Sequence, residues 1–118
     1  EMTNNEINKI IATYHENIDF VDVEKFVVKG KTIHCILEND TYFTIKNYCV
    51  SLDYLIPVWK KLRKDRGGFR ESFRLTIFKD SCVADHTREV GIENLCEGET
   101  IQQAAAHATC KAIQELMK

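Results

Sequence analysis

Cationic side chains are concentrated in one short stretch of this sequence, residues 60–70, where six of the eleven positions are Lys or Arg and the only carboxylate is Asp65. Gly67 and Gly68 let backbone N–H groups approach an anion, and Phe69 offers an aromatic face for stacking. This combination is typical of a phosphate site or a site for single-stranded RNA. It also suits the solvated face of an amphipathic helix that runs into an exposed loop. The candidate binding residues are Lys60, Arg63, Lys64, Arg66 and Arg70.

Acidic side chains form two clusters elsewhere in the sequence. The first is Glu16, Asp19, Asp22 and Glu24, and the second is Glu89, Glu93, Glu97 and Glu99. An acidic surface can imitate the phosphates of a nucleic acid and occupy a basic groove on a nucleic-acid-binding partner. Ordinary solvated loops would have the same composition. The formal net charge is only −2, so the overall charge does not favour a nucleic acid as partner.

Metal-binding residues are present but poorly spaced. His107 and Cys110 are three residues apart in a predicted helix and share a face, and Cys82, His86 and Cys96 would have to join them. No C-x-x-C or H-x-x-x-H pair anchors such a site. We therefore predict neither a metal site nor a cofactor.

Nucleophilic catalysis has only a weak signature. Cys82 with Asp85 and His86 resembles a thiol with its base, but no oxyanion loop is recognisable. Neither of the glycine-rich phosphate-binding motifs G-x-x-x-x-G-K-S/T and G-x-G-x-x-G occurs in the chain. We assign no catalytic residues and expect a protein that is not an enzyme.

The chain of 118 residues is long enough for one domain, residues 1–118, with one core. Hydrophobic residues make up 44% and charged residues 29%, as in soluble globular proteins. Five cysteines, an odd number without a visible signal peptide, predict free and mostly buried thiols in a reducing cytoplasm. No apolar run approaches the roughly 20 residues that a membrane-spanning helix needs.

The sequence pattern of residues 1–50 predicts one helix and three strands. Thr3 and Glu6 fit a capping box, and apolar residues at helical spacing predict a helix that ends near Glu16 or Asn17. Strands are predicted over 24–29, 32–37 and 42–45, the last with a possible extension to residue 50. Gly30 makes the first turn because it tolerates positive φ. The predicted arrangement is an antiparallel meander.

The sequence pattern of residues 51–118 predicts two helices and two strands. A helix capped by Ser51 or Asp53 carries Pro57 in or just after its first turn, where the missing N–H costs least. Strands follow over 73–78 and 81–84. Thr100 begins the last helix with a capping box. The apolar face of the first of these helices is Leu55, Ile56, Trp59 and Leu62, and that of the last is Ile101, Ala105, Ala108, Ala112 and Leu116.

The order of elements is α-β-β-β-α-β-β-α. This order predicts an α+β domain in which helices flank a mostly antiparallel sheet as a layered sandwich.

The run Cys49-Val50-Ser51-Leu52-Asp53 leads into the helix that carries Trp59, and a strand and an Ala-rich helix follow. This succession resembles the phage ABA sandwich domain of small phage and prophage proteins, over about residues 49–118. The resemblance implies a three-layer α/β/α domain without shared catalytic residues. The charged stretch 60–70 and the meander before Ser51 depart from that family.

The segment from Gly98 to Ala105 is similar to the last helix of double-stranded-RNA-binding domains. Those domains contact phosphates with lysines at the start of that helix. Here the corresponding positions are Gln102 and Gln103, and Glu97 and Glu99 precede them. The extra helix in the middle of the chain also interrupts the order of elements in that family.

The resemblance to phage proteins and the uneven charge lead to one functional expectation. We expect a phage-encoded binding protein in the cytoplasm of a bacterial host, which inhibits a defence system as an anti-CRISPR protein acting on a nuclease effector or its guide RNA. The partner is then a host defence protein or its RNA complex, with no role for a membrane and with the oligomeric state left open. One alternative is a sponge for a nucleotide signal, using Phe69, Arg70, Arg74 and Trp59. Another is a small RNA- or nucleotide-processing enzyme that depends on His86 or His107.

Overall fold

The computed structural model describes the backbone of residues 2–65, 72–77, 82–87, 92–98 and 100–117, and the side chains of residues 2–65 and 100–117. Three α-helices and six strands lie within these ranges. They are α1 (Asn4–Glu16), β1 (Val23–Lys29), β2 (Thr32–Leu37), β3 (Tyr42–Lys46), the 3-10 turn η1 (Tyr48–Val50), α2 (Leu52–Asp65), β4 (Ser72–Ile77), β5 (Cys82–Thr87), β6 (Ile92–Gly98) and α3 (Ile101–Leu116).

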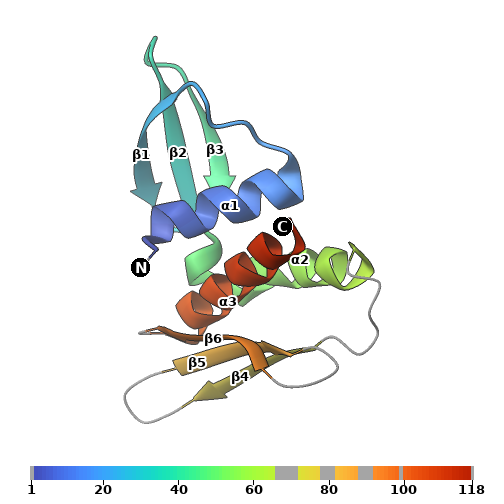
Figure 1. Cartoon of the computed structure of the whole chain (residues 1–118). Helices are drawn as coiled ribbons and strands as arrows, with labels where there is room; N and C mark the ends of the chain where they lie inside the picture. The colour runs from blue at the N-terminus through green and yellow to red at the C-terminus, as the bar shows by residue number, and fades with distance from the viewer. Residues whose placement is uncertain (1, 66–71, 78–81, 88–91, 99, 118) are drawn as a thin grey trace.

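The strands form two separate antiparallel meanders, β1-β2-β3 and β4-β5-β6. Figure 1 shows the three helices between these two sheets, with α1 against the first sheet and α3 against the second. The predicted α+β class is confirmed. The predicted layering differs, because helices separate two small sheets instead of flanking a single one.

The succession of three strands followed by a helix occurs twice in this fold. The first meander leads through η1 into α2, and the second leads into α3. The predicted strand over 81–84 belongs to β5, and β6 was not predicted. The sequence predicts no strand over residues 92–98, where Glu93 and Glu97 belong to the second acidic cluster. Backbone pairing of β6 with β5 makes residues 92–98 a strand.

Local capping sets the ends of α1 as predicted. The Thr3 hydroxyl oxygen accepts a hydrogen bond from the backbone N–H of Glu6 at 3.2 Å. At the other end, Asn17 adopts a left-handed φ of 56°, which asparagine tolerates better than most residues. Ile7 and Ile11 on the apolar face are buried in the core.

The first sheet buries one face. Ile33, Cys35 and Ile45 are buried on that face. Phe20 packs near it, with its ring centroid 5.9 Å from the ring centroid of Phe26. Gly30 turns β1 into β2 with a φ of +66°, as predicted.

The predicted extension of the third strand to residue 50 is wrong. β3 ends at Lys46, and Asn47 caps the 3-10 turn η1 by accepting a hydrogen bond from the N–H of Cys49 at 3.3 Å. Side chains of asparagine compete for backbone groups in this way, and this competition ends the strand.

The buried face of α2 differs slightly from the prediction. Leu55 and Leu62 are buried as expected, but Ile56 is 42% exposed and Val58 is buried in its place. The spacing i, i+3, i+7 of Leu55, Val58 and Leu62 follows one side of the helix, so the core lies against that side. Pro57 is the sixth residue of α2, just after the first turn.

The central element is α3, which contacts both other helices, η1 and the second sheet. Thr100 caps it by accepting a hydrogen bond from the N–H of Gln103 at 3.1 Å. The predicted alanines are buried, while Ile101 and Leu116 at the two ends are only partly buried. Burial also extends around the helix because α3 has neighbours on two sides. The fully enclosed residues are Ala104, Ala105, Ala106, Ala108, Thr109, Cys110, Ala112 and Ile113.

Candidate binding surfaces

Three of the predicted cationic residues form one surface on α2. Lys60, Arg63 and Lys64 are exposed, and their spacing i, i+3, i+4 places them on one side of the helix. This side is opposite the buried residues Leu55 and Leu62. Within the described part of the chain, none of these three side chains makes a hydrogen bond or an ion pair. We refer to Lys60, Arg63 and Lys64 as the cationic face of α2.

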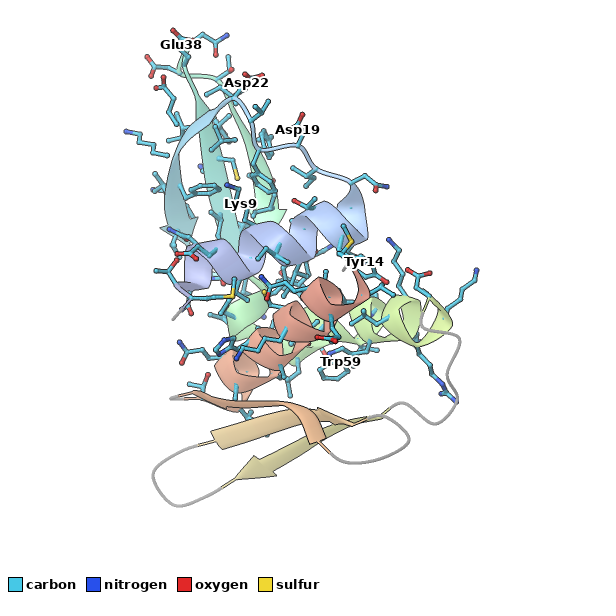
Figure 2. All side chains as sticks on the ribbon, viewed as in Figure 1. Lys9, Tyr14, Asp19, Asp22, Glu38 and Trp59 are labelled. Carbon is cyan, nitrogen blue, oxygen red and sulfur yellow. The ribbon has the colours of Figure 1, made fainter. Side chains whose placement is uncertain are left out.

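Two neighbouring charges in the same helix have a different role. Lys61 donates a hydrogen bond from Nζ to the backbone oxygen of Tyr14 at 2.6 Å, and the same Nζ lies 4.1 Å from the centroid of the Tyr14 ring. Asp65 accepts a hydrogen bond from the Tyr14 hydroxyl. Burial raises the pKa of Tyr14, and the hydrogen bond to Asp65 raises it further. Lys61 and Asp65 therefore hold α2 against α1. Tyr14, the residue of α1 at this junction, is labelled in Figure 2.

The remaining predicted residues, Arg66 and Arg70, lie outside the described residues, as do Gly67, Gly68 and Phe69. The structure thus brings together three of the five predicted binding residues. For Arg66 and Arg70 the assignment stays a prediction.

Part of the first acidic cluster lines a surface hollow at the tip of the first sheet. The hollow has a volume of about 650 Å³, and its charged lining residues are Asp22, Glu24 and Glu38. Val21 beside them is 79% exposed. Figure 2 shows Asp22 and Glu38 close to one another at this tip, far from α2. Glu38 was not in the predicted cluster, although the hairpin that pairs Leu37 with Val23 brings it there.

The other two residues of that cluster have local partners. Glu16 accepts a hydrogen bond from Lys46 at 2.8 Å, which is also an ion pair. The Asp19 carboxylate accepts one from the N–H of Val21 at 2.9 Å and so fixes the loop before β1. In the second acidic cluster, Glu93 and Glu97 belong to β6, where only the backbone is described. Glu89 and Glu99 lie outside the described residues.

A second hollow, of about 780 Å³, lies between α1, α3 and the end of α2. Ile10, Tyr14, Ile113 and Met117 give it a largely apolar lining, and Lys9 and Lys61 contribute cations. This hollow was not predicted from the sequence, since its lining comes from three helices that are far apart along the chain.

Of the residues considered for a metal site, Cys110 is buried and His107 is partly buried on α3, whereas the side chains of Cys82, His86 and Cys96 are not described. Cys35, Cys49 and Cys110 are buried thiols, as predicted for structural cysteines. Burial raises the pKa of Cys35 to about 11 and that of Cys49 to about 12. Among the residues that the structure describes, no three His, Cys, Asp or Glu side chains are grouped to hold a metal ion. The side chains of Cys82, Asp85 and His86 are not described.

Of the two aromatic residues assigned to the nucleotide sponge, Trp59 packs against the core. Trp59 is partly buried against the core, and its Nε1 donates a hydrogen bond to the Thr109 hydroxyl at 2.7 Å. Figure 2 shows Trp59 beneath α3. Phe69 and Arg70 lie outside the described residues, and only the backbone of Arg74 is described.

Comparison of this chain with protein-family models, with curated proteins and with solved structures finds no match. The phage ABA sandwich resemblance therefore stays a prediction. No helix among the described residues is long and apolar enough to cross a membrane.

Proposed function

We propose that this protein is a binding protein that holds an anionic macromolecular partner with the cationic face of α2. The observation that carries this proposal is the set of exposed side chains Lys60, Arg63 and Lys64 on one side of a helix, without a carboxylate partner in the described chain. Such cations can pair with phosphates or carboxylates without first breaking an internal ion pair. Arg63 can also make two parallel hydrogen bonds to one anion.

The surface charge is separated along the molecule. Cations lie at the end of α2, whereas Asp22, Glu24 and Glu38 lie at the tip of the first sheet. This separation orients a charged partner during approach and favours one docking geometry. Cations near a helix C-terminus also stabilise the helix dipole, by about 0.3–1 kcal/mol each. Stabilisation of the helix dipole accounts for cations in the last turn of α2, which contains Arg63 and Lys64. It does not account for the cation at Lys60.

The proposal extends to a particular partner, a bacterial defence nuclease or its guide RNA, so that the protein acts as an anti-CRISPR inhibitor from a phage. A guide RNA offers phosphates to the cationic face of α2. The basic channel of a nuclease would accept the acidic tip of the first sheet. Together with the resemblance of residues 49–118 to a phage domain, this complementarity is the support for the assignment.

A pull-down from a bacterial lysate, with and without RNase, tests the proposal. The variant Arg63→Glu/Lys64→Glu should lose its captured partner, and reversal of Arg63 and Arg66 together should abolish inhibition of the defence system. The matched control Lys31→Glu/Lys111→Glu has the same net charge and should keep the partner. Equal loss in both double variants would show that only the overall charge matters, and the proposal would then be wrong.

A second candidate function is supported by the hollow between α1, α3 and α2. Its volume of about 780 Å³ is that of a small-molecule site, which typically measures about 300–1,000 Å³. Lys9 and Lys61 could pair with phosphates, which suits a sponge for a nucleotide signal. Thermal shift assays with cyclic nucleotides and ADP-ribose derivatives test this function. An unchanged melting temperature with each compound would contradict it.

A further inference from the structure

The first sheet has an outer face whose residues are fixed by strand register. Residues directly opposite one another in an antiparallel pair point to the same side. Because Ile33, Cys35 and Ile45 are buried on one side, their neighbours in sequence lie on the other. Three rows of paired residues therefore share the outer face: Lys29, Thr32 and Lys46; Val27, His34 and Thr44; and Lys25, Ile36 and Tyr42.

Cations occupy three of the four corners of this outer face, and Tyr42 occupies the fourth. Lys25 and Lys29 are both exposed on β1. They are four residues apart, or about 13 Å at the usual rise of a strand. Lys46 is paired with Glu16 at 2.8 Å, so its charge is partly compensated. None of the nine residues on the face carries a carboxylate. The acidic residues Asp22, Glu24 and Glu38 begin beyond Lys25, at the tip of the sheet.

An aromatic pair occupies the middle and the edge of the same face. The rings of His34 and Tyr42 are stacked, with centroids 4.5 Å apart and an angle of 11° between the planes. Tyr42 is nonetheless 58% exposed, so contact with His34 leaves much of its surface open to solvent. The contact holds the tyrosine ring in one orientation, which reduces the entropy cost of stacking a further ring on it.

We propose that the outer face of the first sheet binds a single-stranded nucleic acid, with a base stacked on Tyr42 and the phosphates on Lys25 and Lys29. Aromatic side chains beside cations are the usual means by which proteins bind single strands, because every base has a face that can stack. A duplex keeps its bases stacked on one another and offers phosphates only. An acidic protein segment would use the lysines but would gain nothing comparable from Tyr42.

This inference concerns a different surface from the cationic face of α2. Its test is therefore independent of the test of the proposed function. Fluorescence anisotropy with labelled ten-nucleotide oligo(U) RNA, oligo(dT) DNA and a duplex of equal length tests it. Both single strands should bind more tightly than the duplex, and the RNA and DNA arms show which of the two is preferred. Tyr42→Ala should raise the Kd for the single strand about fivefold or more, while Tyr42→Phe should keep the wild-type Kd.

A second variant tests the lysines without touching the aromatic pair. Lys25→Glu/Lys29→Glu should weaken binding and should lower the slope of log K against log salt by about 1.4, the value for two lost phosphate contacts. The control Lys111→Glu, a charge reversal on α3 outside both candidate surfaces, should leave the Kd within about twofold. Val28→Ala, on the opposite face of β1, should do the same. Circular dichroism confirms that each variant is folded.

A double-mutant cycle separates the two surfaces. The effect of Tyr42→Ala should be equal in the wild-type and the Arg63→Glu/Lys64→Glu backgrounds, because distant and independent sites are additive. The inference is overturned if Tyr42→Ala changes the Kd less than twofold, or if the duplex binds as tightly as the single strand. Competition by poly-glutamate as effective as that by oligo(U) would also overturn it and would point to an acidic protein partner.

Discussion

The side-chain amide of Asn8 donates a hydrogen bond from Nδ2 to Oδ1 of Asn47 at 3.0 Å, and both residues are buried. Asn8 in turn accepts a hydrogen bond from the N–H of Tyr48 at 2.7 Å. Asn47 donates through Nδ2 to the backbone oxygen of Gly30 at 3.0 Å. Two amide side chains thus join α1, the turn between β1 and β2, and the connection into α2.

Replacement of Asn8 tests the energetic weight of this network. Asn8→Ala leaves the N–H of Tyr48 without its acceptor in the core, so the free energy of unfolding should fall by about 2–4 kcal/mol. Urea denaturation of the two proteins measures the difference. The control is Asn5→Ala, the same substitution at an exposed position of α1. Similar losses for both variants would show that the buried network contributes little.

Acid should destabilise the fold through His15. Burial lowers the pKa of this imidazole, and the charges of Lys46 and Lys61 lower it further against the opposing effect of Glu16. The folded protein therefore binds a proton less readily than the unfolded chain, whose histidine pKa is about 6.5. The stability is complete above that value and falls as the pH drops toward the lowered pKa.

His15→Gln should remove this part of the pH dependence. The melting temperature of the wild type should fall more steeply than that of the variant between about pH 7.5 and 5.5, a range above most carboxylate titrations. Melting curves followed by circular dichroism provide the measurement. Parallel curves for the two proteins would contradict the assignment to His15.

Three core thiols should be unreactive in the folded protein. Cys35, Cys49 and Cys110 are buried, and burial raises the pKa of the first two to about 11 and about 12. The thiolate is the reactive form, so almost none is present at pH 8. In Cys82→Ser/Cys96→Ser, which keeps only these three, Ellman's reagent should react slowly in buffer and completely in urea. A fast phase in buffer would show that a core thiol is accessible.

The junction of α1 and α2 should depend on Tyr14. Tyr14→Phe removes the hydrogen bond to Asp65 but keeps the ring beneath Lys61. It should lower the free energy of unfolding by about 1 kcal/mol. Lys61→Met should also destabilise, because it removes the hydrogen bond to the backbone of Tyr14 and the cation. Lys60→Met, at an exposed neighbouring position, should stay within about 0.5 kcal/mol of the wild type in urea denaturation.

Several elements were predictable because their signals are local. Helices α1 and α3 begin at capping boxes. The N-cap is Thr3 in α1 and Thr100 in α3, and each is followed three residues later by Glu or Gln. Alternation of apolar residues predicts β2 with its observed bounds. β6 was missed, since its glutamates weaken the apolar alternation and its identity depends on pairing with β5.

The candidate site was only partly predictable for the same reason. The sequence shows six cations in residues 60–70, but it does not show which of them have internal partners. Tyr14, 51 residues before Asp65, engages both Asp65 and Lys61. That contact leaves Lys60, Arg63 and Lys64 as the cations exposed on α2. No pattern within the stretch distinguishes Lys61 from its neighbours.

The sequence by itself determined the N-caps of α1 and α3, the first meander, the α+β class and the concentration of cations in α2, because each depends on neighbours within a few residues. The tertiary structure alone decided that helices separate two sheets, that Lys61 and Asp65 belong to the junction with α1, and that Lys25 and Tyr42 share a face with His34. These relationships join residues that are distant along the chain, so strand register and helix packing had to be known before they could be recognised.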